Sequence, residues 1–285
     1  MRWNSGSLDD LPALQSLCDG ADAIIHCAGL AHVFRPGPQT PAEFVRVNVQ
    51  GTRNAFEAAA QAGIHDWVLV SSVSVYGGGA AVSVPESAIC KPAGDYARTK
   101  FEAEQIAAEL AARAGARLTI LRMATLYGEG DRGNILRLMQ SLHAHRFPPI
   151  GGTNRKTLLY VEDAARACLL PLRSPVEGTQ IFNVAGPAYP MKEIVGAMAK
   201  GLGISAPAVW LPAGPVSKIA GLAAATGIPQ LRRAAAQLEK FLGEDAYDGS
   251  LFRRAAGFEP AVGLEEGMRR EAAWYLANRA AQQPD

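Results

Sequence analysis

The sequence predicts an α/β protein with a parallel β-sheet, because short β-branched runs alternate with alanine-rich helical stretches over its first two thirds. Three apolar runs are typical of buried strands: Ala23 to Cys27, Trp67 to Ser71 and Leu118 to Arg122. Helices are expected between them, from about Pro41 to Ala62 and from about Tyr96 to Ala114. Active sites in such sheets form at the carboxyl ends of the strands, so functional side chains are expected at that edge.

The pattern loosens after Arg122 into loops rich in glycine and proline. Further helices are predicted at Ile135 to His145, Val161 to Leu172 and Met191 to Leu202, and the final Ala280 to Asp285 is expected to fray. We therefore predict one domain over residues 1–122, together with parts of 150–186, and a smaller mixed α/β substrate region over 123–285.

Composition excludes several classes of protein. The net charge is +1 and neither sign is concentrated, which argues against a nucleic-acid or membrane-surface footprint. The apolar stretch from Ala206 to Pro229 is interrupted by Pro212, Pro215 and Lys218, so no membrane span is expected. The amino terminus lacks the apolar core of a signal peptide, and a cytoplasmic protein is predicted.

The cysteines and histidines give no sign of a metal site. Cys18, Cys27, Cys90 and Cys168 match neither a zinc site nor a redox pair, and all four are interpreted as reduced, small buried hydrophobes. His26 lies in an apolar strand and is interpreted as a core histidine whose hydrogen bonds are satisfied. No metal is predicted.

Tyr96 and Lys100 are the strongest chemical signal. They lie four residues apart at the start of a predicted helix, so their side chains share one face. A phenol is a poor base at pH 7 unless a neighbouring cation favours the phenolate, and Lys100 supplies that cation. A hydroxyl donor for the substrate oxygen is available at the serine-rich strand end upstream, where Ser72 is the best placed. A Tyr and Lys at this spacing alone would also fit a solvated helix face.

Several segments together resemble one enzyme family. They are IHCAGL at 25–30, VNVQGT at 47–52, SSVSVYG at 71–77, YARTK at 96–100, LRMATLYGEGDRGN at 121–134, NRKTLLYVEDAARA at 154–167, FNVAG at 182–186 and GFEPAVGLEEGMRREAAWY at 257–275. The chain is similar to extended short-chain dehydrogenases/reductases, the NAD-dependent epimerase/dehydratase family, and most of all to nucleotide-sugar 4-epimerases and 4-reductases.

The resemblance implies a Rossmann-type, doubly wound parallel sheet, NAD or NADP as cofactor, a nucleotide-sugar substrate and a possible homodimer. The catalytic residues that it implies are Ser72, Tyr96 and Lys100. Its implied cofactor-binding residues are Leu8, Cys27, Ala28, Gly29, Leu30, Asn48, Ser71, Tyr96, Lys100 and Met123, with Ser7 in place of the family's usual aspartate beside Leu8. Its implied substrate-binding residues are Ser74, Thr125, Arg132, Asn134, Arg155 and Lys156.

A glycine-rich turn for the cofactor pyrophosphate is expected between the first strand and first helix of such a fold. Only seven residues precede Leu8, so we expect the chain to be shortened at its amino terminus and to lack its first βαβ unit. The GxGxxG spacing of residues 128–133 is not interpreted as the cofactor loop, because Glu129 and Asp131 would oppose a pyrophosphate, and the resemblance implies a substrate loop there instead.

The predicted activity is hydride transfer, at C4 of a nucleotide-diphosphate sugar, with Tyr96 as base and Ser72 polarising the oxygen. Two alternatives stay open at this point. One is a reductase of a non-sugar carbonyl, such as a steroid or flavonoid-like ketone, for which the cationic Arg155 and Lys156 would be unnecessary. The other is a binding protein that lacks cofactor affinity.

Overall fold

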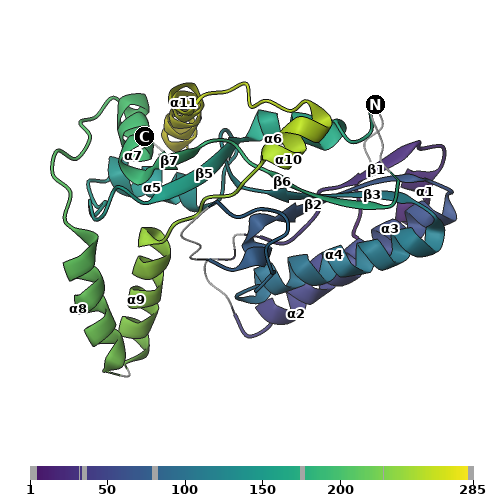
Figure 1. Ribbon diagram of the computed structural model, residues 1–285, viewed down its shortest axis with the longest axis horizontal. Coiled ribbons are helices and arrows are strands. Elements are labelled where there is room, and N and C mark those ends of the chain that lie inside the picture. Colours follow the sequence, from purple (N-terminus) through teal and green to yellow (C-terminus); the bar gives the residue numbers. More distant parts are fainter. Residues whose placement is uncertain are drawn as a thin grey trace.

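The larger of two sheets contains four parallel strands in the order β1-β2-β3-β6 (Figure 1). The computed structural model describes residues 5–31, 33, 37–78, 83–173, 177–226 and 228–281. The four strands are β1 (Ala23–His26), β2 (Asp66–Ser72), β3 (Arg117–Met123) and β6 (Thr179–Val184). The three strands predicted from apolar runs are confirmed within one or two residues at each end.

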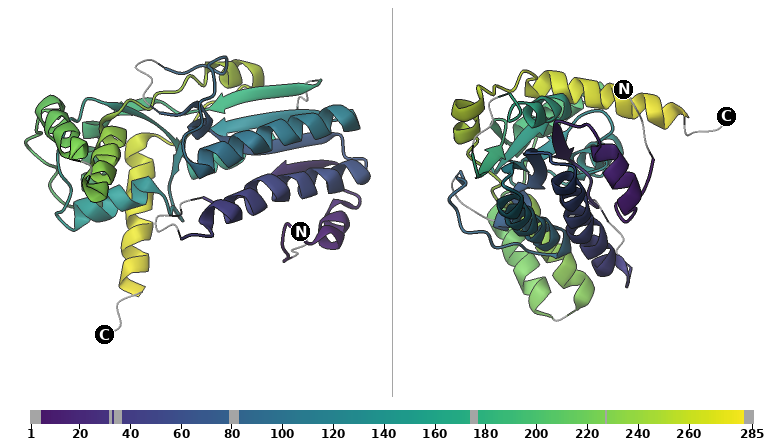
Figure 2. Two further views of the ribbon diagram at one scale, coloured as in Figure 1. Left: turned by 90° about the horizontal axis from the view of Figure 1, so that it is seen from below. Right: turned by 90° about the vertical axis from the view of Figure 1, so that its right-hand side faces the viewer.

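One face of this sheet is covered by α3 (Gly51–Gln61) and α4 (Asp95–Ala114), as Figure 2 shows, with α1 (Leu11–Cys18) beside α3. Phe56 of α3 is fully buried and stacks on Trp67 of β2, with ring centroids 4.8 Å apart. The alanines of α4 let the helix lie close to the strands, because Ala103, Ala107 and Ala111 are fully buried there. Helix α4 ends at Gly115, which takes the left-handed conformation that glycine tolerates best.

The other face is covered by α6 (Val161–Leu169) and α10 (Ser250–Ala256). Phe182 of β6, Phe252 of α10 and Phe258 form a chain of ring contacts with centroids 5.4 and 5.3 Å apart. Buried side chains thus lie on both faces of the sheet, as in doubly wound parallel folds. The predicted fold class is confirmed.

The helical stretch before β2 is interrupted. It was predicted as one helix from Pro41 to Ala62, but α2 (Thr40–Phe44) and α3 are joined by a π-helical segment at Val45–Gln50. Such segments are rare in proteins, but those that occur often lie at functional sites. This one contains Asn48, which is only 1% exposed.

A second, three-stranded sheet lies beyond the carboxyl ends of the larger one. In it β4 (Thr125–Tyr127) runs parallel to β5 (Arg155–Tyr160), and β5 runs antiparallel to β7 (Ala188–Pro190). Its core is closed by α5 (Asn134–His143), α7 (Met191–Leu202) and α11 (Leu264–Ala281). The predicted helices at 135–145, 161–172 and 191–202 are confirmed, although the second ends at Leu169.

Two further helices, α8 (Ala213–Ala225) and α9 (Pro229–Leu242), form a hairpin that extends away from both sheets (Figures 1 and 2). The sequence pattern predicts no helix over residues 213–242, so both helices are additions to the predicted fold. Within the described ranges, every helix is too short or too polar to cross a membrane. The expected fraying from Ala280 is wrong for Ala280 and Ala281, which belong to α11, and the rest of that tail lies outside the described residues.

Candidate active site

Tyr96 and Lys100 lie in the first two turns of α4, against the carboxyl end of β2. The Lys100 side chain is buried, and its Nζ donates a hydrogen bond to the Val70 carbonyl oxygen at 2.6 Å. Burial lowers the pKa of Lys100 to about 8, while the negative charges of Glu104 and Cys27 oppose that shift. The ammonium is therefore fixed at the sheet edge and is still mostly charged at pH 7.

Ser72 ends β2 and faces Tyr96. Burial raises the pKa of the Tyr96 phenol, and a hydrogen bond with Ser72 partly offsets that rise. In this structure the Lys100 ammonium is directed at the Val70 carbonyl, and burial has the largest effect on the pKa of the phenol. Ser72 and Tyr96 nevertheless present two adjacent hydroxyl groups, one turn of helix from a cation, where a substrate oxygen could lie between them.

A 3-10 helix, Val73–Tyr76, begins directly after Ser72, whose Oγ accepts a hydrogen bond from the Ser74 backbone N–H at 3.2 Å. The Oγ of Ser74 is buried and, within the described part of the chain, has no hydrogen-bond partner. A buried hydroxyl of this kind normally has a partner. The Ser74 hydroxyl could therefore bond to a group other than the described residues.

Asn48 clamps the loop that follows β1. Its Oδ1 accepts from the Leu30 backbone N–H at 2.7 Å, and its Nδ2 donates to the Leu30 carbonyl at 3.1 Å and to Thr99 Oγ1 at 3.1 Å. A side chain at Gly29 would place its Cβ 3.2 Å from Asn48 Oδ1 and 3.8 Å from Lys100 Nζ. The structure therefore brings together Gly29, Leu30, Asn48 and Lys100, which form a corner beside the carboxyl end of β1. A side chain at position 29 would crowd this corner.

The other predicted cofactor residues are spread around this corner. Met123 pairs in register with Ser72 and is buried. Leu8 packs over Gly51 at the start of α3, and its carbonyl accepts from Asn54 Nδ2 at 2.8 Å. The Ser71 hydroxyl donates to Glu104 Oε1 at 2.5 Å and so points into the protein interior.

Cys27 and Ala28 directly follow β1 and are both exposed. The interpretation of all four cysteines as buried is wrong for Cys27, which is exposed in the loop after β1, and for Cys90, which is half-buried in the loop before α4. A hydrogen bond from the Cys168 thiol, and then the charge of Lys100, lower the pKa of Cys27 to about 7 against the effect of burial.

His26, by contrast, is the satisfied core histidine that the sequence predicts. Its Nε2 hydrogen-bonds Thr52 Oγ1 at 3.0 Å, and burial lowers its pKa to about 4.

Sequence reasoning missed a buried ionic network below the catalytic groups. Glu104 and Arg122 are each 3% exposed and form an ion pair with 2.7 Å between Oε2 and Nη2. Arg122 also donates to the Tyr76 hydroxyl at 2.9 Å, and Tyr76 donates to Asn183 Oδ1 at 2.7 Å. The signal that could have revealed it was an arginine inside an apolar strand run and a glutamate one turn after Lys100.

The predicted substrate residues lie on the second sheet and the loops around it. Thr125, Arg132, Asn134 and Arg155 are exposed, and Asn134 is the first residue of α5. Lys156 is bound within the protein: its Nζ donates to Asp245 Oδ2 at 2.6 Å and to the Gly243 carbonyl at 2.8 Å. Of these cations, Lys156 is the one whose side chain is bound most extensively within the protein.

The loop with GxGxxG spacing follows β4 and is held by the carboxyl-terminal helix. The Gly128 N–H donates to Glu271 Oε2 at 3.1 Å, and Tyr160 hydrogen-bonds Glu129. Burial, followed by the charge of Asp131, raises the pKa of Glu271 to about 8. This carboxyl group, whose Oε1 is also buried without a partner among the described residues, was not foreseen from the sequence.

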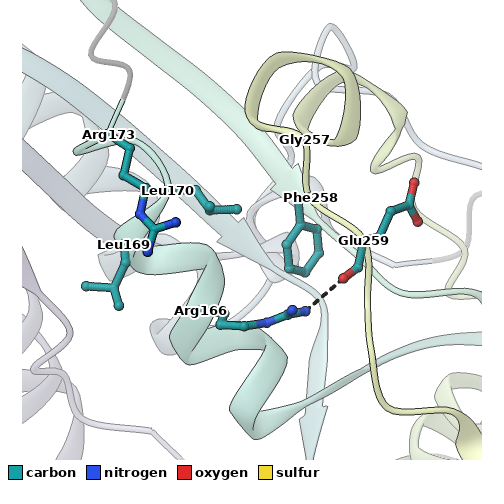
Figure 3. Close-up of a pocket in the computed structure, with 7 residues that line it drawn as sticks. All are labelled: Arg166, Leu169, Leu170, Arg173, Gly257, Phe258 and Glu259. Carbon is teal, nitrogen blue, oxygen red and sulfur yellow. Dashed lines mark hydrogen bonds between the residues drawn. The ribbon is translucent and has the colours of Figure 1, made fainter.

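A separate small pocket of about 170 Å³ lies between α6 and the end of α10 (Figure 3). Arg166, which donates to the Glu259 carbonyl at 2.7 Å, and Phe258 form part of its wall. None of the predicted site residues lines it.

Comparison with known proteins identifies the family of this chain. Residues 2–185 match the NAD dependent epimerase/dehydratase family. The N-acetyl-alpha-D-glucosaminyl-diphospho-ditrans,octacis-undecaprenol 4-epimerase of Escherichia coli O157:H7 is 27% identical over 93% of this chain and 81% of the relative. The dTDP-glucose 4,6-dehydratase of Streptomyces griseus is 28% identical over 99% of this chain and 80% of the relative. Among solved structures, MoeE5 in complex with UDP-glucuronic acid and NAD is 27% identical, with a TM-score of 0.75 over 98% of this chain and 86% of that one.

Proposed function

Because the chain belongs to the NAD dependent epimerase/dehydratase family, we propose that it transfers a hydride reversibly at C4 of a nucleotide-diphosphate sugar. The observation that supports this most is the meeting of Tyr96, Ser72 and Lys100 beside the corner formed by Gly29 and Asn48. A base, a hydroxyl donor and a fixed cation next to an open backbone corner are the groups that hydride transfer at a carbinol needs.

The residues at this corner fit a nicotinamide dinucleotide. Gly29 leaves room for close approach, Asn48 holds the Leu30 backbone in place, and the unpartnered Ser74 Oγ awaits a ligand atom nearby. The groups that would hold the cofactor and substrate at this edge are Leu8, Cys27, Ala28, Gly29, Leu30, Asn48, Tyr96, Lys100, Met123 and Ser74. When bound, NAD supplies the site that accepts and returns the hydride.

The chain's own residues manage the proton. Tyr96 takes the proton of the sugar hydroxyl as the carbon is oxidised, and Ser72 donates a hydrogen bond to the same oxygen. A buried phenol resists ionisation, so the phenolate needs a cation close by once water is excluded. Lys100 is one turn away on α4, and its ammonium has donors beyond the one that it gives to Val70.

The diphosphate of the substrate requires cations on the side of the second sheet. Arg132 is exposed in the loop before Asn134, whereas the backbone N–H groups of Gly133 and Leu136 at the amino terminus of α5 already donate to the Asp131 carboxylate. Arg155 is exposed at the start of β5. We assign the phosphate contacts first to Arg132 and Arg155, because Lys156 is already paired with Asp245. A non-sugar carbonyl substrate would need none of these cations and is not favoured.

A sugar linked through diphosphate to a polyprenol is a second candidate substrate. The Escherichia coli relative is named for such a substrate, and the exposed apolar side chains of the α8–α9 hairpin favour contact with lipid. The reacting sugar carbon and the catalytic groups would be the same.

The experiment is a conversion assay with NAD and a panel of UDP-, dTDP- and polyprenyl-diphosphate sugars, read by NMR, on the purified chain and on the same chain preceded by a βαβ unit with a glycine-rich turn. We expect C4 inversion or oxidation of one donor class by the protein with that turn, and a loss of about 10²-fold or more when it carries Tyr96→Phe. Tyr275→Phe is the matched control, because it removes a hydroxyl that, among the described residues, bonds His143 Nδ1 at 3.2 Å, and it should retain turnover. Full turnover by Tyr96→Phe would contradict the proposal.

A further inference from the structure

The hairpin of α8 and α9 exposes large apolar side chains around its turn. Ile219 and Leu222 on α8 are 67% and 73% exposed, and Ile228 and Leu231 on the other side of the turn are 47% and 38% exposed. None of the described side chains of α8 is buried, and the helix packs mainly against α9. We call these four residues, with Lys218 and Arg232, the hairpin tip. Apolar side chains gathered on a protruding element mark an interaction surface.

The charge of this segment is one-sided. The sequence holds no aspartate or glutamate from Ile194 to Leu238, whereas Lys218 and Arg232 are both exposed. Lys218 lies one helical turn before Leu222, so the two side chains share a face, and Arg232 follows Leu231 directly. Cations whose apolar stems border exposed aliphatic side chains are typical of helices that lie at a membrane interface. The whole chain has a net charge of only +1, so its overall composition does not indicate this local excess of positive charge.

We propose that the hairpin tip docks on the surface of an anionic phospholipid bilayer. Ile219, Leu222, Ile228 and Leu231 enter the headgroup region, and Lys218 and Arg232 contact the lipid phosphates. Each helix is too short to span, since the 13 residues of α8 extend about 20 Å. The end of the hairpin at which α8 and α9 meet lies farthest from the sheets, so the body of the protein stays clear of the membrane (Figure 1).

A second copy of the chain is the other occupant to consider. Two identical tips would bring Lys218 and Arg232 of each copy close to those of the other, with no acidic side chain in the hairpin up to Leu238 to offset the repulsion. An anionic surface offers the complementary charge. The observations therefore favour lipid, and this inference does not depend on which sugar the enzyme converts.

The test is flotation of the chain with vesicles of phosphatidylglycerol and phosphatidylcholine, compared with phosphatidylcholine alone. We expect binding to the anionic vesicles that weakens as salt is raised. Ile219→Asp/Leu222→Asp should lower the partition coefficient at least about tenfold, and Lys218→Glu/Arg232→Glu about tenfold. The matched control is Leu11→Asp/Leu17→Asp on α1, where the two leucines are 46% and 49% exposed at the other end of the molecule, and its binding should not change.

Circular dichroism melting checks that each variant is folded, and Ile219→Ser/Leu222→Ser replaces the aspartate pair if that variant is not. A wild-type chain that fails to float with anionic vesicles overturns the proposal. So does a tip variant that floats as well as the α1 control. Dimers seen by light scattering that disappear in the tip variant, without vesicle binding by the wild type, would assign the tip to a second copy instead.

Discussion

Glu104→Gln is the substitution that most sharply probes how the fold supports the candidate site. It removes one charge from a pair in which both side chains are 4% exposed, while it keeps the shape of the side chain. Glu104 accepts from Arg122 Nη2 at 2.7 Å and Nε at 3.0 Å, and from Ser71 Oγ at 2.5 Å. The variant leaves the Arg122 guanidinium buried without its counter-ion.

The expected loss in the free energy of unfolding is about 3–5 kcal/mol, the usual effect of removing one partner of a buried ion pair. A second effect concerns Lys100, whose pKa of about 8 is held up by the charge of Glu104. Without that charge the Lys100 pKa falls further. Because the ammonium form is the active one, activity is lost as pH rises through this pKa, and the alkaline limb of the pH–rate profile moves to lower pH.

Urea unfolding and a pH–rate profile measure the two effects. Glu102→Gln on the same helix is the matched control, because Glu102 pairs with Arg98 at the surface, with side chains 37% and 43% exposed, and its loss should change stability by only about 0.5 kcal/mol. Glu104→Leu/Arg122→Met should recover most of the stability. The reasoning is refuted if Glu104→Gln unfolds like Glu102→Gln and its alkaline limb stays in place.

Three further predictions concern single groups. Glu271 has a folded pKa of about 8, above its unfolded value. Its contribution to the free energy of unfolding is therefore full below about pH 4.5 and is lost as pH rises to 8, on the order of 4 kcal/mol in all. Chemical unfolding at pH 5 and 8.5 should show this fall in the wild type and a flat response in Glu271→Gln. Cys27, with a pKa of about 7, should react with iodoacetamide at pH 7 faster than Cys90, because burial raises the pKa of Cys90. Bound NAD should slow the reaction of Cys27. Equal rates for the two cysteines, measured by mass spectrometry, would contradict the assigned environment. Asn48→Ala removes both hydrogen bonds to Leu30 and should raise the Kd for NAD roughly tenfold or more in a fluorescence titration, whereas unchanged affinity would show that the loop after β1 needs no clamp.

Much of the sheet and of the catalytic groups could be predicted from the sequence. Strands β2 and β3 are largely buried and β1 is half-buried at the edge of the sheet, and all three appear as continuous apolar runs whose ends are easy to place. The spacing of Tyr96 and Lys100 is local to one helix, and Ser72 ends the strand that the helix packs against. Local periodicity was therefore sufficient for these residues.

Long-range pairing could not be predicted in the same way. Nothing near Lys156 in the sequence indicates Asp245, which is 89 residues away, and the Arg122 and Glu104 pair joins a strand to a helix. The π-helical segment around Asn48 was missed because a change of hydrogen-bond register leaves the apolar pattern almost unaltered.

The α8–α9 hairpin could not be predicted for a different reason: prolines lie in or next to the first turns of both helices. Pro212 immediately precedes α8, Pro215 lies in its first turn, and Pro229 begins α9. In the first turn of a helix the backbone N–H has no partner within the helix, so proline is tolerated there.

The central claim is that Tyr96 and NAD together move the hydrogen at C4 of a nucleotide sugar. The direct measurement uses UDP- and dTDP-hexoses deuterated at C4, with unlabelled NAD in ordinary water, and follows the label by mass spectrometry and NMR. We predict that one donor is converted with its deuterium transferred to or through the nicotinamide and none lost to water, and that Tyr96→Phe slows this transfer about 10²-fold or more. Conversion with washout of the C4 label into water, transfer at the wild-type rate in Tyr96→Phe, or no conversion of any labelled sugar would contradict it.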